Sequence, residues 1–182
     1  MSYNTLADRS YTLYLASGDK VSGSNNNATF NIDWSQLLPV NYNEYKMIWS
    51  FQTTGSYYKD TAGTAIYSTA KVAINFGCRQ FSYDAATRTP SNTIGYITRD
   101  QQTTTSASNI LSAFYYQFPA KTMMRPSNNA ITLTVTNMYS GLPFVTTDNA
   151  GVAQSDMSSW QMAIEFIPID SSLRTDIQFQ NL

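Results

Sequence analysis

The sequence predicts one all-β domain, an eight-stranded jelly-roll sandwich of two four-stranded antiparallel sheets, and three observations lead to this fold class. Segments in which apolar and polar side chains alternate recur along the chain, and a period of two is typical of a half-buried strand. Strong helix formers are scarce, since the 182 residues include only two Glu and five Lys. Long connections join the segments, and these suit Greek-key crossings between two sheets better than tight hairpins.

The first three strands lie close together near the N-terminus. Residues 10–16 place Tyr and Leu side chains at every second position. Residues 28–34 and 44–53 show the clearest alternation, with aromatic side chains recurring on one face, and the fold is organised around them. Between these two strands, residues 35–38 suit a single helical turn, because Pro39 stops a helix from continuing.

Five further segments complete the set. Residues 69–76 carry Val, Ile and Phe on one face, and residues 93–98 form a shorter strand. Residues 112–118 place an aromatic side chain at every second position, and residues 130–138 alternate aliphatic side chains with threonine. The last strand is expected at residues 160–168. The side chains predicted to be buried between the sheets are Phe30, Ile32, Trp49, Phe51, Val72, Ile74, Leu133, Val135, Ile164 and Phe166.

One end of the sandwich is expected to be elaborated. In a jelly roll the connections after the first, third, fifth and seventh strands emerge together, and here they are residues 17–27, 55–68, 99–111 and 139–159. Residues 1–182 read as a single domain with a polar N-terminal arm at 1–9 and a C-terminal tail at 169–182. The apolar side chains of the tail that we expect to contact a neighbouring chain are Ile169, Leu173, Ile177, Phe179 and Leu182.

The composition limits the classes of partner. Charged residues make up 13% of the chain, against about 25% in an average domain, so its surface either is covered by neighbouring subunits or is an ordinary polar β-surface. The net charge is −1 without a basic run, which leaves no footprint for nucleic acid. No signal peptide or membrane span is expected, and Cys78 has no partner for a disulfide, as in a protein made in a reducing compartment.

Catalysis is not expected, nor is a cofactor or a metal. The chain has no histidine, which removes Ser-His-Asp and Cys-His catalysis and imidazole metal sites. Asp33 and Glu44 are the acids inside the core-defining strands, but Asp33 lies on the polar face, where solvent or a neighbouring subunit is the expected partner. Asp148, Asn149 and Asp156 offer oxygen ligands for calcium, yet Asx residues in loops form turns more often.

Several tyrosines lie in or beside the connections at the elaborated end, namely Tyr57, Tyr58, Tyr67 and Tyr139. Exposed aromatic side chains there would stack on sugars or anchor a protein interface, and the alternative is that they cap the core. Cys78 is expected to be a small buried apolar residue.

Residues 10–54 also carry a family resemblance. The segments Tyr11–Leu15, Phe30–Trp34 and Tyr45–Phe51, in a histidine-free chain of this size, resemble the single jelly-roll capsid proteins of large icosahedral double-stranded DNA viruses, in particular penton and minor capsid proteins. The resemblance implies a structural virion protein without catalytic residues, assembled inside the host cell. It also implies partners that are copies of itself, with a five-membered ring as the leading case, and other capsid proteins.

Two other functions stay open from the residues alone. A carbohydrate-binding, lectin-like β-sandwich module would use the loop tyrosines for glycan contact. A glycosidase-like enzyme would need a pair of carboxylates, and the twelve acidic residues are spread thinly along the chain.

Overall fold

A computed structural model describes residues 10–55, 57–60, 69–78, 83–84, 89–99, 109–113, 120–138, 140–147 and 154–169. Within these ranges the regular structure is nearly all β, with one short α-helix. No helix in the same ranges has the length and apolar character needed to cross a bilayer. The predicted arm at 1–9 and the tail beyond Ile169 lie outside the described residues.

The elements follow one another along the chain as β1 (Tyr11–Ala16), the 3-10 turn η2 (Ser17–Asp19), β2 (Ser22–Ser24), β3 (Asn27–Asn31), α1 (Trp34–Leu37), β4 (Glu44–Gly55), β5 (Tyr57–Asp60), β6 (Thr69–Asn75), β7 (Tyr83–Asp84), β8 (Thr89–Pro90), β9 (Thr93–Arg99), β10 (Asn109–Ala113), β11 (Lys121–Met124), β12 (Ala130–Asn137), β13 (Phe144–Thr147) and β14 (Trp160–Ile169).

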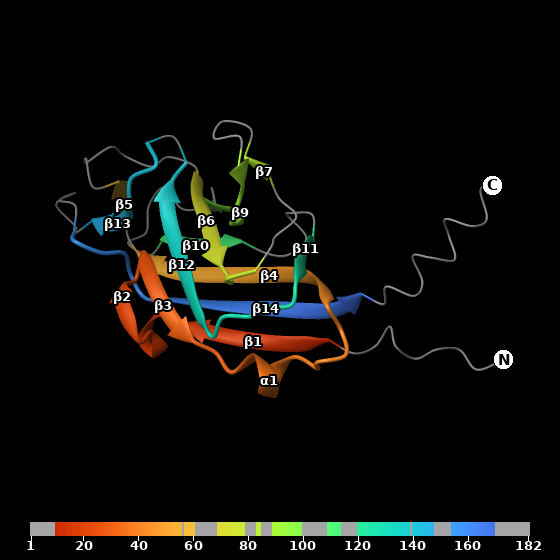
Figure 1. The fold of residues 1–182 in the computed structure, drawn as a ribbon. Coiled ribbons are helices and arrows are strands. Elements are labelled where there is room, and N and C mark those ends of the chain that lie inside the picture. Colours follow the sequence, from red (N-terminus) through yellow and green to blue (C-terminus); the bar gives the residue numbers. More distant parts are fainter. Residues whose placement is uncertain are drawn as a thin grey trace, which may run out of the picture.

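The main strands form two antiparallel leaves that pack against each other (Figure 1). The β1 leaf has the order β1-β14-β4-β10, and the β12 leaf has the order β9-β6-β12-β3-β2. The eight principal strands can be numbered 1 to 8 in chain order, as β1, β3, β4, β6, β9, β10, β12 and β14. In these numbers the leaves read 1-8-3-6 and 5-4-7-2, which is the strand order of a jelly roll. The predicted fold class is therefore confirmed, with the short strand β2 added to one leaf.

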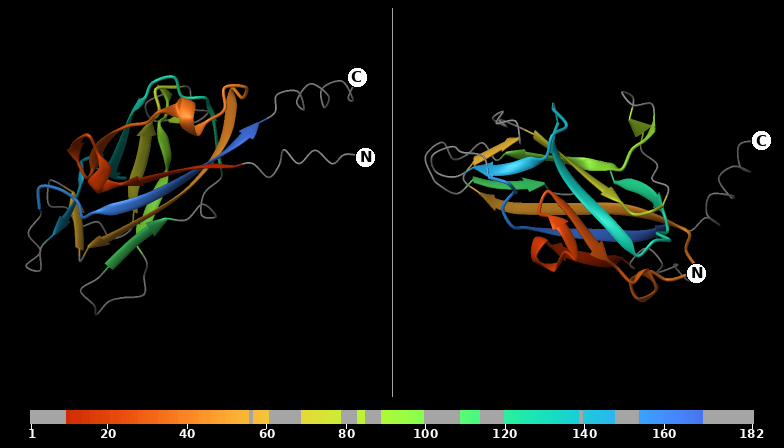
Figure 2. Two further views of the ribbon diagram at one scale, coloured as in Figure 1. Left: turned by 90° about the horizontal axis from the view of Figure 1, so that it is seen from below. Right: turned by 60° about the vertical axis from the view of Figure 1, so that its left-hand side comes forward.

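The two leaves are joined along one side. Leu111 and Ser112 of β10 pair with Arg99 and Thr98 of β9, so the hydrogen-bonded ladder continues from one leaf into the other. The strands of the β12 leaf cross over those of the β1 leaf in Figure 1, and the left view of Figure 2 shows the two layers from another side. Strand β11 extends the β1 leaf by pairing with the first residues of β4.

The space between the leaves is filled by the predicted core. Nine of the ten predicted side chains are at most 4% exposed, and Ile32 is partly buried against the same cluster. Aromatic rings connect the two ends of the core: Trp160 stacks on Phe51 at 5.4 Å, and Phe166 meets Trp34 edge-on at 5.9 Å. Such contacts add roughly 0.5–1.5 kcal/mol per pair beyond area burial.

The sixth strand lies earlier than the alternation predicted. We expected a strand at 112–118, whereas β10 covers Asn109–Ala113, and residues 114–118 lie outside the described residues. The position of β10 is set by its partner, because it pairs with the last residues of β4, from Phe51 to Gly55. The polar run before it hid the start of the strand. Pairing with β4, rather than the aromatic pattern that follows, decides where this strand lies.

The end of the second strand also differs from the expectation. Trp34 is buried, but it begins α1 instead of ending a strand. Asp33 caps this helix by accepting a hydrogen bond from the Ser35 amide at 3.0 Å, and the Leu38 amide closes the turn on the Trp34 carbonyl at 2.8 Å. The helical turn expected before Pro39 is therefore present, one residue earlier.

Short strands occur where the sequence predicted loops. β5, β11 and β13 lie in the expected connections 55–68, 119–129 and 139–159, and each has four residues, too few for a period-two pattern to stand out. At the other end of the chain β14 runs to Ile169, which we had assigned to the tail.

Candidate functional site

The elaborated end of the sandwich gathers segments that are far apart in the sequence. Strands β1, β4 and β12 all end there, and β10 begins there opposite Gly55 (Figure 1). Within the described residues, β5 pairs with β13 over four register positions and joins the third connection to the seventh. The prediction that these connections share one end is confirmed for their described parts.

Asp156 ties the first connection to the last. Its carboxylate accepts hydrogen bonds from the backbone amides of Asn25 at 2.7 Å, Asn26 at 3.1 Å and Met157 at 2.8 Å. The side-chain amide of Asn26 donates in turn to the Phe144 carbonyl at 2.9 Å. A partly buried carboxylate that collects three backbone amides organises the loops around itself.

These hydrogen bonds leave Asp156 a poor ligand for calcium. Both carboxylate oxygens are used by backbone amides, and amide donors face the positions that a cation would occupy. The other two proposed ligands, Asp148 and Asn149, lie outside the described residues. In the described part of the chain, no group of three His, Cys, Asp or Glu side chains is placed to hold a metal.

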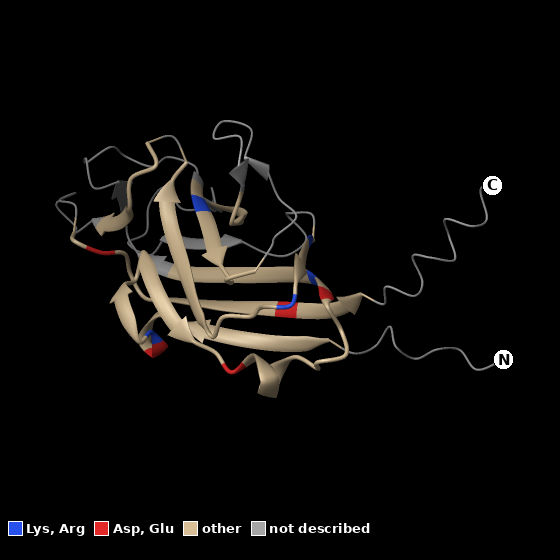
Figure 3. Ribbon diagram, in the orientation of Figure 1, with Lys and Arg blue, Asp and Glu red and all other residues tan. Residues whose placement is uncertain are grey.

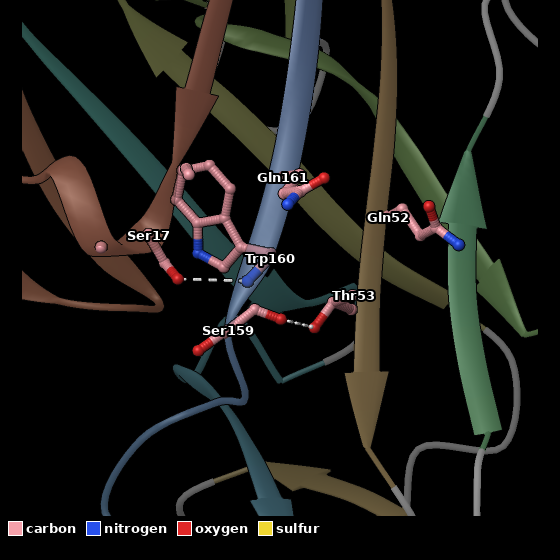
Figure 4. A pocket seen from close by; sticks show the side chains of 8 residues that line it. Ser17, Gln52, Thr53, Ser159, Trp160 and Gln161 are labelled. Atoms are coloured by element: carbon pink, nitrogen blue, oxygen red, sulfur yellow. Dashed lines mark hydrogen bonds between the residues drawn. The ribbon is translucent and has the colours of Figure 1, made fainter.

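Trp160 lies at the centre of the same end. Its backbone amide donates to the Ser17 hydroxyl at 3.1 Å, and its indole N–H donates to the Asn25 carbonyl at 2.7 Å. Beside it, the Thr53 hydroxyl donates to the Ser159 carbonyl at 2.8 Å (Figure 4). These bonds hold the ends of β1, β4 and β14 together, and they use the hydroxyls of Ser17 and Thr53 for structure.

A depression of about 360 Å³ lies where these three strands end. It is lined by Ala16, Ser17, Gly18, Gln52, Thr53, Ser159, Trp160 and Gln161. None of these eight side chains is ionisable. The lining therefore offers hydroxyls, amides and an indole, which suit hydrogen bonding to a neutral polar molecule and provide no nucleophile paired with a base.

The exposed polar side chains of the depression are two glutamines and Ser159. Gln161 of β14 and Gln52 of β4 are direct cross-strand partners, and both are exposed. In Figure 4 the Gln161 side chain extends towards β4, and the Gln52 side chain extends towards β10. Sequence reasoning did not single out either residue, because only the register between β4 and β14 makes the two residues cross-strand partners.

The two carboxylates considered for acid–base chemistry have other roles. Asp33 is fully exposed, and hydrogen bonds from the Ser35 hydroxyl and amide lower the pKa of its carboxyl. Glu44 begins β4, where its register partners are Met124 on one side and Ile169 on the other. Asp33 therefore acts as the cap of α1 rather than as a partner for Glu44.

Cys78, expected to be buried, is only partly buried and packs against the core. The side chain is half-buried and its Sγ donates to the Met124 carbonyl at 3.1 Å. Burial raises the pKa of this thiol to about 11, so the reactive thiolate is scarce at neutral pH. The side chains of Tyr57 and Tyr58, and all of Tyr67 and Tyr139, lie outside the described residues.

The outward face of the β12 leaf carries very little charge. On the described outward positions of β3, β12 and β6, Lys71 is the single charged side chain, among threonines, asparagines and alanines (Figure 3). Thr132 is opposite Thr29 on one side and Asn75 on the other. The threonines that alternate with aliphatic residues in 130–138 therefore face outward, within a polar surface that spans three strands.

Comparisons with known proteins add little. No family model and no curated protein matches the sequence. Among solved structures, the chain is similar to a chain of "Israeli acute paralysis virus heated to 63 degree - full particle", with 10% identity, 93% of this chain and 79% of that chain covered, and a TM-score of 0.25. A likeness of this size carries no argument about fold or function.

Proposed function

We propose that this chain is a structural virion protein, a single jelly-roll penton or minor capsid protein that builds an icosahedral capsid. The observation that carries the proposal is the strand order 1-8-3-6 and 5-4-7-2, since the jelly roll is the sandwich from which many capsids are built. The resemblance of residues 10–54 to these capsid proteins supports it. Because one fold serves several functions, the surfaces must also fit.

The low surface charge supports a role in assembly. A subunit that packs against neighbours must remove water from its contact faces, and each unpaired charge that is buried costs free energy. The β12 leaf offers hydroxyl and amide groups with one lysine, Lys71, on the described outward positions of its three central strands. Removing water from such a face costs little free energy, and its hydroxyls and amides still form hydrogen bonds that fix the orientation of a neighbour.

The two outward faces differ, as a closed ring requires. A cyclic assembly joins two different surfaces of the same chain. The β12 leaf presents mainly threonines, whereas the β1 leaf presents Tyr14, which is 78% exposed, with Ile48 and Ile167 partly exposed on the same face. These two unlike faces support a homo-oligomer, with a pentamer as the leading case.

The two ends of the sandwich also differ from each other. Tyr11 at the start of β1 pairs with Phe166 near the end of β14, so the chain enters and leaves the sandwich at the end opposite the elaborated loops. The start of β1 and the end of β14 therefore lie side by side at that end of the sandwich. We propose that contacts with other capsid proteins are made there and that the loop end faces a different layer of the particle.

The experiment that tests this proposal is quantitative mass spectrometry of purified particles, together with sedimentation of the isolated protein. We expect the protein in the particles in a fixed ratio to the major capsid protein, and a discrete oligomer in solution. Absence from the particles, together with a monomer at high concentration, would contradict the proposal. We expect no catalytic activity, and a hydrolase activity that is lost on changing one carboxylate would overturn that part.

A further inference from the structure

The outward face of the β1 leaf has an arrangement that assembly does not explain. Across its three strands, Tyr14 is opposite Ala163, and Ala163 is opposite Ser50. The adjacent outward row, about 7 Å along the strands, places Gln161 opposite Gln52. An exposed aromatic ring thus lies beside a floor of two small side chains, with two amides along one edge.

We propose that this face binds a neutral carbohydrate, in a site formed by Tyr14, Gln161, Gln52 and the depression that continues from the two glutamines. The site occupies part of the β1 leaf face that carries Tyr14, so it requires that contacts between copies of the chain leave this part of the face uncovered. It also differs from the loop tyrosines considered from the sequence, because Tyr14 lies on a strand of the sandwich.

The chemistry of the site matches a sugar ring. A pyranose has an apolar C–H face that packs on an aromatic ring, and its edge carries hydroxyls that both donate and accept hydrogen bonds. Tyr14 is 78% exposed, so its ring is free to take this contact. Each primary amide provides two donors and one acceptor, which pairs well with two neighbouring hydroxyls. Ala163 and Ser50 are small enough to let the ring approach the sheet.

The glutamine amides are available. Within the described part of the chain, neither Gln52 nor Gln161 forms a side-chain hydrogen bond, whereas the hydroxyls of Ser17 and Thr53 behind them are used by the backbone. The depression of about 360 Å³ lies at the lower end of the range for ligand sites. One sugar ring would pack on Tyr14 over Ala163, and a second ring would extend into the depression beyond the two glutamines.

The nearby charges favour neutral sugars over acidic ones. Glu165 follows Ala163 on the same face of β14, about 7 Å further along the strand. The nearest lysine on the same face of β4 is Lys46, four residues from Ser50 and therefore about 13 Å away. Lys20 lies nearer, but its ammonium already donates to the Ser17 carbonyl at 3.0 Å and to Asn25 Oδ1 at 2.9 Å. The carboxylate of Glu165 next to Ala163 therefore disfavours an acidic sugar such as sialic acid.

The test uses the full chain and saturation-transfer difference NMR with the methyl glycosides of glucose, galactose, mannose and N-acetylglucosamine at millimolar concentration. We expect transfer to the ring C–H protons of at least one glycoside. Tyr14→Ala removes the stacking surface and Ala163→Leu fills the floor, and each should weaken binding at least about tenfold. Gln161→Ala should weaken it severalfold, and lactose should bind better than sialyllactose.

The matched control is Thr134→Leu, which places the same bulk at a central outward position of the opposite leaf and should leave binding unchanged. Equal thermal melting of all variants shows that they fold. The proposal is wrong if none of the four glycosides shows transfer, or if Tyr14→Ala binds as the wild type does. A change in sedimentation of Tyr14→Ala without any sugar binding would instead assign this face to contacts between copies of the chain, and would also overturn the proposal.

Discussion

Replacing Asp156 with alanine tests whether one carboxylate holds the loop end together. The substitution removes the acceptor of three backbone amides, those of Asn25, Asn26 and Met157, at 2.7, 3.1 and 2.8 Å. A hydrogen bond to a charged group contributes about 1.5–3 kcal/mol, and bonds that share one acceptor do not add fully. Asp156 is partly exposed, which lets water replace some of the loss.

We therefore expect Asp156→Ala to lower the free energy of unfolding by about 3 kcal/mol, which corresponds to a fall in Tm of about 6–12 °C for a domain of this size. Asp156→Asn keeps one acceptor oxygen and should lie between the wild type and the alanine variant. Asp19→Ala is the matched control, because Asp19 is an exposed carboxylate of the neighbouring turn, and it should change stability by less than about 0.5 kcal/mol.

Two assays measure the effect: denaturant unfolding gives the global loss, and amide hydrogen exchange gives its location. The amides of Asn25, Asn26 and Met157 should exchange faster in Asp156→Ala, while those of β6 and β12 should keep their protection except for the global change. If Asp156→Ala loses less than about 1 kcal/mol and these three amides keep their protection, the carboxylate does not organise the loop end as we argue.

Three further outcomes are expected. Gly23→Ala should lower the free energy of chemical unfolding by at least about 1 kcal/mol, because Gly23 has a φ of +88° and an added Cβ would clash with the Asn27 carbonyl. An unchanged free energy of unfolding would refute this. Asp33→Ala should be less stable than the wild type near neutral pH, and the two stabilities should converge in strong acid. The reason is that the lowered pKa of the Asp33 carboxyl in the folded state gives stability that is lost as the pH falls through that pKa. A difference in stability that persists in acid would show that the carboxylate charge is not its cause. Deleting residues 170–182 should weaken assembly in sedimentation experiments and leave the melting transition nearly unchanged, whereas unfolding of the truncated chain would place the tail in the core.

The sequence predicted the core well because that information is local. In β4 and β14 every second side chain is apolar, and the sandwich buries these positions in both strands. The alternation itself therefore indicates the buried face, whatever the partner strand is. Trp34 shows the limit of this reasoning: it continues the alternation of residues 28–34, but a helix capped by Asp33 begins at that residue in place of the expected strand end.

The candidate sites could not be predicted because they depend on register. Asn25 and Asp156 are 131 residues apart, and no local pattern connects an asparagine amide to a distant carboxylate. In the same way, Tyr14 and Gln161 form part of one surface only because β1 pairs with β14 in one particular alignment. A shift of one residue would send Tyr14 into the core and Leu13 outward.

The ladder that passes from β9 to β10 makes the two long sides of the sandwich mechanically unequal. On that side backbone hydrogen bonds join the leaves through Leu111 and Ser112. On the other side, among the described residues, β1 pairs with β14 and β2 with β3, so no backbone ladder joins the leaves there. Breathing of the domain should therefore be a rotation about the β9–β10 side that separates β1 from β3, and protection against hydrogen exchange should rise steadily from the free side to the joined one.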